Sequence, residues 1–307
     1  MNPELLFQSF QSYPWLAFPL ALLGTTLSAA LSGPGFRRGA LAISAALPSV
    51  FLPWLIPSSL GIYRFFLCLI ALLPVIRAFD RAREKRPLSF PHRLWAATAP
   101  FETRSISRIP PSLDLPRLAF TLIYFVLAAL GYGLAFCGAP KWDGPLYWIM
   151  RWLGGTVFIY CTVDAVIGFF VALYRAMGIV FPPVHLTPIL AKSLQEFWGE
   201  RWNLTMRGWF YRHCFLPLAR RRKKMLGIAA AFGASTLLHI WLAFVVAGFW
   251  PSLWMGAFFV VQGMLTLAER RFGVLLWAPA AARVWTVLCL VGSAPLFVEP
   301  MLRGFGR

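Results

Sequence analysis

Apolar residues dominate the chain in eight long runs, which are separated by segments rich in arginine, lysine and proline. The runs cover residues 13–32, 39–57, 59–79, 118–137, 152–174, 225–249, 251–268 and 283–302. Each approaches or exceeds the roughly 18 residues that a helix needs to cross a bilayer. Helices satisfy all their backbone hydrogen bonds internally, and the sequence lacks the alternation of a membrane barrel. The pattern therefore predicts an all-α, polytopic membrane protein with about eight transmembrane helices.

The composition supports this prediction. Of the 307 residues, 59% are hydrophobic and only 13% are charged, whereas about a quarter of the residues in a soluble protein are charged. We therefore expect one transmembrane domain that covers residues 1–307. The five cysteines are scattered and show no CxxC spacing, so neither a disulfide framework nor a metal site is expected.

Basic residues gather in four of the segments between the runs. Segments 33–38, 80–117, 175–224 and 269–283 carry 23 of the 29 lysines and arginines. With eight spans, these four segments lie on the same side, and the positive-inside rule assigns that side to the cytoplasm. Both termini are then predicted to lie outside. This arrangement explains the net charge of +18, so no nucleic-acid partner is expected.

The two longest cytoplasmic segments differ in character. Residues 80–117 are rich in proline and arginine and are predicted to be irregular. In the other segment, Pro188 precedes an expected amphipathic helix near 189–212, interfacial or re-entrant. Its predicted aromatic face is formed by Leu194, Phe197, Trp198, Arg201 and Trp202.

His239 is the first candidate for chemistry, because it lies in an otherwise apolar run. It follows Lys224 by 15 residues, which places it about 22 Å into a straight helix. An ionisable group at this depth is costly and is by default a functional-site hypothesis. A buried neutral imidazole also retains its base form, which suits the deprotonation of an alcohol. The alternative is a neutral histidine that hydrogen-bonds another helix.

Two further polar residues are weaker candidates. Asn203 ends a polar and aromatic block, where its amide is either a hydrogen-bond donor to a carbonyl or a helix-end residue. Asp164 lies in the fifth run and is either a site residue or the partner of a nearby arginine: Arg64, Arg151 or Arg175. For the other histidines, His92, His185 and His213, we expect a solvated or interfacial role.

The block 193–203, SLQEFWGERWN, resembles the signature of the wax synthase branch of the membrane-bound O-acyltransferase (MBOAT) family. In that family, a block of the form Ser-Leu-x-x-Phe-Trp-Gly-x-Arg-Trp-Asn/His precedes a span that bears an invariant histidine. The resemblance implies an acyl transfer from acyl-CoA to a hydroxyl group, with His239 and Asn203 as catalytic residues. The residues beside His239 depart from the family's pattern, and this departure bears mainly on the choice of acceptor.

From this resemblance we expect acyl-CoA as the co-substrate, without another cofactor. The acceptor is expected to be a lipophilic alcohol that approaches from the bilayer, either a long-chain alcohol or a sterol or terpenoid. Membrane lipids are expected as further partners. Substrate-binding roles are expected for four residues near the block or in the fifth run: Trp198, Arg201, Trp202 and Asp164. The arginine among them suits the phosphates of CoA, unless it forms a local ion pair with Glu196 or Glu200.

Two other classes of membrane protein remain as alternatives. A transporter or lipid-binding protein would require a polar pathway with several ionisable groups, and only Asp164 and His239 clearly fit. A membrane terpene cyclase would use Asp164 as an acid. The sequence has neither a serine hydrolase elbow nor a P-loop, which argues against those classes.

The charge pattern predicts the sidedness of the loops. Cysteines introduced one at a time into 80–117 and 178–224 should react with an impermeant thiol reagent only from the cytoplasmic side. Cysteines in 138–150 should react only from the opposite side, because the lysines and arginines are distributed so unequally. If all three segments react from one side, the number of predicted spans is wrong.

Overall fold

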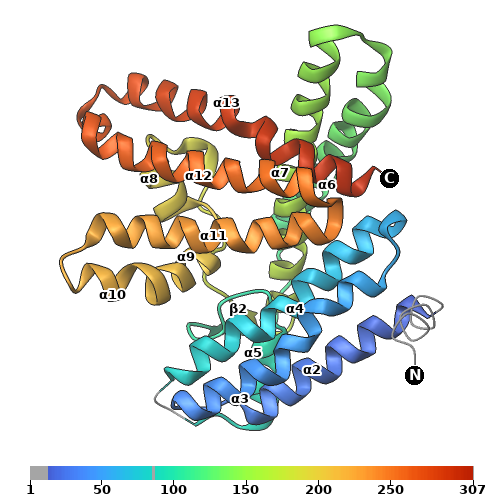
Figure 1. Cartoon of the computed structure of the whole chain (residues 1–307), viewed down its shortest axis with the longest axis vertical. Helices are drawn as coiled ribbons and strands as arrows, with labels where there is room; N and C mark the ends of the chain where they lie inside the picture. Colours follow the sequence, from blue (N-terminus) through green and yellow to red (C-terminus); the bar gives the residue numbers. More distant parts are fainter. Residues whose placement is uncertain (1–12, 85–86, 307) are drawn as a thin grey trace. The chain divides into compact units, whose positions relative to one another are not determined.

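The computed structural model describes residues 13–84 and 87–306, and within them it is almost entirely helical (Figure 1). Eight helical segments are long and apolar enough to cross a membrane, by length and composition. They are Pro14–Leu31, Phe36–Leu55, Ser58–Ala82, Leu115–Lys141, Gly144–Ala176, Lys224–Ala247, Phe249–Phe272 and Pro279–Phe305. The predictions of an all-α fold and of eight spans are therefore confirmed.

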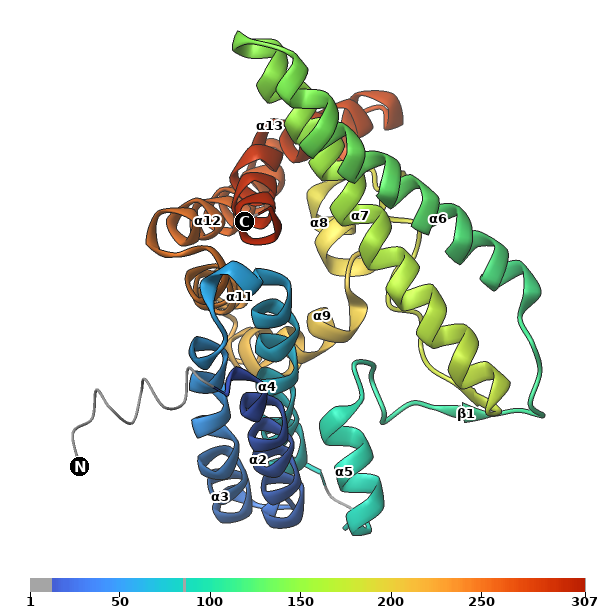
Figure 2. The same ribbon diagram turned by 90° about the vertical axis from the view of Figure 1, so that its right-hand side faces the viewer.

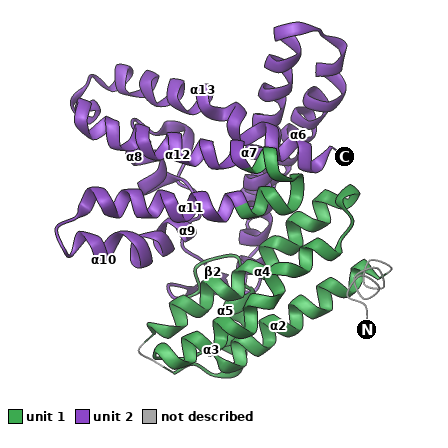
Figure 3. Cartoon of the chain, in the orientation of Figure 1, with its two compact units in different colours: residues 1–103, 241–252, 307 green, residues 104–240, 253–306 purple. Residues whose placement is uncertain are grey.

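The chain divides into two compact units (Figure 3). Of the described residues, unit 1 contains 13–84, 87–103 and 241–252, and unit 2 contains 104–240 and 253–306. The helices of unit 1 are η1 (Pro14–Leu16), α2 (Ala17–Leu31), α3 (Phe36–Ala46), η2 (Leu47–Leu55), η3 (Ser58–Leu60), α4 (Gly61–Ala82) and α5 (Phe90–Thr98). Helix α5 lies in the segment 80–117, so the prediction that this segment is wholly irregular was wrong.

Unit 1 is held together by small apolar side chains and by arginines that reach backbone carbonyls. Arg64 of α4 donates from Nε to the Ile56 carbonyl at 2.5 Å and from NH1 to the Val245 carbonyl at 2.9 Å. Arg93 of α5 donates to the carbonyls of Ala30 and Ser32, at the end of α2. These carbonyls lie at or near helix ends, where the backbone lacks intrahelical partners.

Unit 2 contains the longer helices. They are α6 (Leu115–Gly133), α7 (Gly144–Ala176), α8 (Leu194–Glu196), α9 (Leu204–Phe210), α10 (Leu216–Ala219), α11 (Lys224–Ala247), α12 (Phe249–Phe272) and α13 (Pro279–Phe305). The end of α11 and the start of α12, within 241–252, belong to unit 1. Shorter turns are η4 (Leu134–Gly138), η5 (Ala139–Lys141), η6 (Pro188–Leu190), η7 (Phe197–Arg201), η8 (Tyr211–Phe215) and η9 (Val274–Leu276). Two short strands, β1 (Ser107–Arg108) and β2 (Ile179–Val180), pair antiparallel.

The single helix predicted near 189–212 is not formed. After Ser193, whose side chain accepts the Glu196 amide as an N-cap, the chain makes only α8 and the π-helical turn η7. Asn203 then takes the left-handed conformation, with φ 40° and ψ 61°, and α9 begins at the next residue. A left-handed residue interrupts an α-helix, and asparagine adopts this conformation more readily than most residues. The aromatic block is therefore a compact broken segment.

Helices α6 and α7 lie side by side along much of their lengths (Figure 2). Glycines allow this close approach, because a Cβ atom on Gly131 would lie 2.5 Å from the backbone nitrogen of Phe158. A Cβ atom on Gly154 would lie 2.7 Å from the backbone nitrogen of Ala135. Small residues at a helix interface let two backbones approach closely in a membrane protein.

Replacing Gly131 with alanine should destabilise the protein by about 1–3 kcal/mol, because the new methyl group meets rigid backbone. Gly133 provides a matched control in the same helix, since no heavy atom lies within 4 Å of its added Cβ. Gly133→Ala should be neutral or stabilising by up to about 1 kcal/mol. Thermal unfolding in one detergent compares the two variants, and equal melting temperatures would contradict this packing.

Candidate active site

His239 lies on α11, and both the hydrogen bond and the ring packing of its imidazole are defined. Nδ1 lies 2.8 Å from the backbone carbonyl oxygen of Ser235, one turn earlier. A carbonyl oxygen only accepts, so Nδ1 carries the proton and Nε2 carries the lone pair. Among the described residues, Nε2 has no hydrogen-bond partner. The imidazole is therefore prepared to accept a proton through Nε2.

Aromatic side chains from the two following helices surround this imidazole. Phe259 of α12 lies against it, with the ring centroids 3.9 Å apart, and Phe297 of α13 lies at 6.4 Å. Trp198, from the broken segment, packs against Phe258 and Phe259 at 6.2 and 6.1 Å. The structure thus brings the predicted residue Trp198 to within one side chain of His239.

Two buried polar residues of α12 hold the block in place. Gln262 accepts a hydrogen bond from the Trp198 indole at 2.9 Å and donates to the Ser293 hydroxyl at 2.8 Å. Glu269 accepts from the backbone amides of Leu194 and Gln195 at 2.7 and 3.0 Å. The carboxylate of Glu269 also accepts from the indole of Trp285, on α13.

Sequence reasoning missed both of these residues, although a signal was present. Gln262 lies in the apolar run 251–268, and Glu269 follows directly after that run, seven residues from Gln262. This spacing places the two side chains on one face of a helix. Both are fully or almost fully buried, at 0% and 1% exposure. A polar pair at this spacing in a membrane span indicates a partner segment on that face.

Asp164 of α7 pairs with a histidine and not with any of the three arginines considered for it. Its carboxylate lies 2.6 Å from Nδ1 of His185, and the two side chains are only 14% and 7% exposed. The His185 ring stacks on the indole of Trp202, with centroids 4.4 Å apart and planes 19° apart. The expectation of a solvated or interfacial role for His185 was therefore wrong.

Arg201 is engaged within its own segment. Its Nε and NH2 contact the Glu196 carboxylate at 2.6 Å, and its NH1 donates to the Leu186 carbonyl at 2.8 Å. Burial acts to raise the pKa of Glu196, but hydrogen bonds from the Lys192 amide and Arg201 outweigh it and lower that pKa. The carboxylate stays charged and fixes the guanidinium locally, the arrangement that the sequence offered as the alternative to CoA binding.

Asn203 caps α9 with one half of its amide. Its Oδ1 accepts the backbone N–H of Met206 at 3.2 Å, the usual N-cap bond. This bond assigns the oxygen to the helix and leaves Nδ2 as the donor. Among the described residues, Nδ2 has no hydrogen-bond partner. The capping and donor roles that the sequence presented as alternatives are thus compatible in one side chain.

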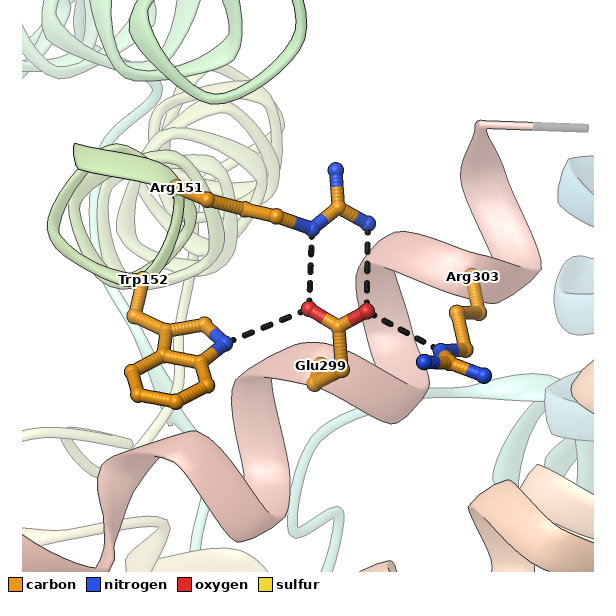
Figure 4. A network of polar contacts seen from close by, with 4 residues as sticks. All are labelled: Arg151, Trp152, Glu299 and Arg303. Carbon is orange, nitrogen blue, oxygen red and sulfur yellow. Dashed lines mark hydrogen bonds and ion pairs between the residues drawn. The ribbon is translucent and has the colours of Figure 1, made fainter. Parts of the chain in front are cut away.

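A second polar network lies between α7 and α13 (Figure 4). Glu299 is only 2% exposed, and its carboxylate accepts hydrogen bonds from Nε and NH2 of Arg151 at 2.9 and 3.4 Å. The indole of Trp152 and the guanidinium of Arg303 donate to the same carboxylate at 3.2 and 2.9 Å. The sequence does not predict this network, because Arg151 and Glu299 lie 148 residues apart. It ties α7 to the end of α13 that carries Phe297.

No cluster of three or more histidine, cysteine or acidic side chains that would hold a metal ion occurs among residues 13–84 and 87–306. The polar contacts of the His239 imidazole are with the carbonyl and hydroxyl oxygens of Ser235. The chemistry that this imidazole supports is proton transfer through its second nitrogen.

A known family matches the part of the chain that carries these features. The model of the membrane bound O-acyl transferase family matches residues 181–261, which include the block 193–203 and His239. This part of the chain is therefore similar to membrane-bound O-acyltransferases. The family match ends just before Gln262, so both polar anchors on α12 lie beyond it.

The proteins to which the chain is similar carry acyltransferase names. It is 32% identical over 162 residues to a probable long-chain-alcohol O-fatty-acyltransferase 2 of Arabidopsis thaliana, covering 48% of this chain and 47% of that protein. It is 27% identical over 278 residues to an acyl-CoA–sterol O-acyltransferase 1 of the same plant, covering 83% and 78%. A long-chain-alcohol O-fatty-acyltransferase of Simmondsia chinensis is 33% identical over 101 residues, covering 30% and 29%.

The match to the long-chain-alcohol relatives is partial, since the chain spans about half, or less, of the length of those proteins. The expected resemblance to the family and to its wax synthase branch is confirmed.

Proposed function

We propose that the chain is a membrane-embedded O-acyltransferase that moves an acyl group from acyl-CoA to the hydroxyl of a lipophilic alcohol. The observation that carries this proposal is the His239 imidazole, whose Nδ1 is committed to the Ser235 carbonyl. Its Nε2 is then an acceptor within an apolar helix, where a neutral base is favoured over a charged one. The names of the relatives support acyl transfer to an alcohol.

In this mechanism, the alcohol gives its proton to Nε2 of His239 as its oxygen attacks the thioester carbonyl carbon. A C–O bond forms, and the carbonyl oxygen becomes a tetrahedral oxyanion. Nδ2 of Asn203 donates a hydrogen bond to that oxyanion. The C–S bond then breaks, and the CoA sulfur leaves with the proton returned by the imidazolium. The products are an ester and free CoA.

A long-chain alcohol is the first acceptor, in agreement with the names of most of the relatives. A sterol is the second, because the sterol-acylating relative aligns over most of its own length. Acyl-CoA approaches from the basic loops, which we assign to the cytoplasm, and the alcohol enters from the bilayer. Membranes incubated with acyl-CoA and a panel of alcohols, read by mass spectrometry, test both acceptor classes.

The rival functions have less support. A terpene cyclase would need Asp164 as a free acid, and this carboxylate is held by His185 at 2.6 Å. Of the polar side chains proposed above, Arg201 has a structural role, because Glu196 and the Leu186 carbonyl engage its guanidinium. Trp198 supports the aromatic wall next to His239, which is where an acyl or alcohol chain would lie.

His239→Ala should lower turnover by about 10² to 10⁴ while leaving membrane insertion intact, since it removes the general base. Thr236→Val is a matched control on the same helix, because the Thr236 hydroxyl is satisfied by the Phe232 carbonyl. The purified variants are compared in the ester-forming assay at equal protein levels. Turnover near that of the wild type in His239→Ala would remove His239 from the mechanism.

Asn203→Asp should distinguish the capping role of Oδ1 from the proposed donor role of Nδ2. Aspartate caps a helix about as well as asparagine, so the melting temperature should stay close to that of the wild type. Loss of the donor, with a negative charge in its place, should lower turnover by at least about 10² to 10³.

Asn203→Gly is the companion variant, because glycine adopts the left-handed conformation and costs only a few tenths of a kcal/mol at an N-cap. It should also fold and also lose turnover. A stable and fully active Asn203→Asp enzyme would leave Asn203 with a capping role alone.

A further inference from the structure

The segment before η6 runs beside the end of the aromatic block. At one point there, two residues of the block face a single residue of that segment. The Leu186 amide donates to the Arg201 carbonyl at 2.9 Å, and the Leu204 amide donates to the Val184 carbonyl at 2.8 Å. Between these bonds, His185 stands alone on one side, and Trp202 with Asn203 on the other. An extra residue of this kind bends the chain and re-aims a side chain, as in a β-bulge.

The side chain of His185 holds this bulge-like turn from one face. Its ring stacks on the Trp202 indole at 4.4 Å. The indole also stacks with Phe197 at 5.6 Å and 12°, and with Tyr160 at 5.9 Å and 30°. Trp202 is thus fixed among three rings, and its peptide leads directly into Asn203.

Helix α7 supplies the fixed points of this arrangement. Asp164 holds Nδ1 of His185 at 2.6 Å, and Tyr160 stands one helical turn before Asp164. The pair is largely removed from solvent, which strengthens its hydrogen bond relative to one in water. A contact path therefore runs from α7 through Asp164, His185 and Trp202 to the backbone of Asn203.

We propose that Asp164 and His185 are positioning residues, which set the bulge-like turn so that Nδ2 of Asn203 meets the oxyanion. This inference rests on the proposed donor role of Asn203. The two residues touch neither substrate nor His239 in this proposal; they act through Trp202 and Asn203. Because catalysis by a hydrogen-bond donor depends on placement to within about 1 Å, loosening the turn lowers the rate without removing a reacting group.

The test is a double-mutant cycle with Asn203. The double variant Asp164→Leu/His185→Phe replaces the pair with apolar side chains of similar size and keeps a ring against Trp202, so the fold should survive. Its kcat should fall by about 10-fold to 10²-fold, with little change in KM for the alcohol. In the Asn203→Asp background, the same double change should have almost no further effect, because the donor it positions is already absent.

Two more variants make the test selective. Asp164→Asn keeps an amide that still hydrogen-bonds the His185 ring, so its loss of kcat should be clearly smaller than that of Asp164→Leu/His185→Phe. Asp114→Asn changes a different α7 contact, the 3.7 Å pair with Arg175. It should leave kcat unchanged in both the wild-type and the Asn203→Asp backgrounds.

The proposal would be overturned if Asp164→Leu/His185→Phe lowered kcat by the same factor in the Asn203→Asp background as in the wild type. The pair would then act independently of Asn203. A complete loss of kcat in Asp164→Asn would also overturn it, because it would assign chemistry to the charged pair. Normal turnover in His239→Ala would separately show that the proposed function is wrong. A loss of kcat that disappears in the Asn203→Asp background, with an unchanged KM, supports the positioning role.

Discussion

Polar groups placed among apolar helices must find partners within the protein, because hydrocarbon offers no hydrogen bonds. In unit 2, this constraint is met by side chains that link separate segments. Gln262 and Glu269 link α12 to the aromatic block, Asp164 links α7 to His185, and Glu299 links α13 to α7. An unpaired group of this kind would cost several kcal/mol. The bonds that remove this cost therefore also fix the relative placement of the helices around the site.

The aromatic block shows how these bonds shape the chain. Its amphipathic pattern favours one helix, but Glu269 binds the first amides of α8, and Gln262 binds the indole of Trp198. The chain then breaks at Asn203, where the left-handed conformation ends one helical piece and begins the next. The break places the two tryptophans in different surroundings. Trp198 packs against Phe259, the ring that lies on the His239 imidazole, and Trp202 stacks on His185.

The two proposed catalytic groups share one design. In His239 and in Asn203, one polar atom is bound to the backbone of an adjacent helical turn, and the other atom is left for a ligand. The structural bond decides which chemical role remains, an acceptor in His239 and a donor in Asn203. Groups held in this way need little reorganisation during a reaction, which is the main source of electrostatic catalysis.

The sequence by itself determined the membrane class, the eight helices, the block 193–203 and the isolated His239, because hydropathy and local motifs depend only on neighbouring residues. Only the tertiary structure decided which polar groups meet. Asp164 pairs with His185, which is 21 residues away, and Glu299 pairs with Arg151, which is 148 residues away. Such pairs are set by helix packing and by breaks in the chain, and neither follows from spacing along the sequence.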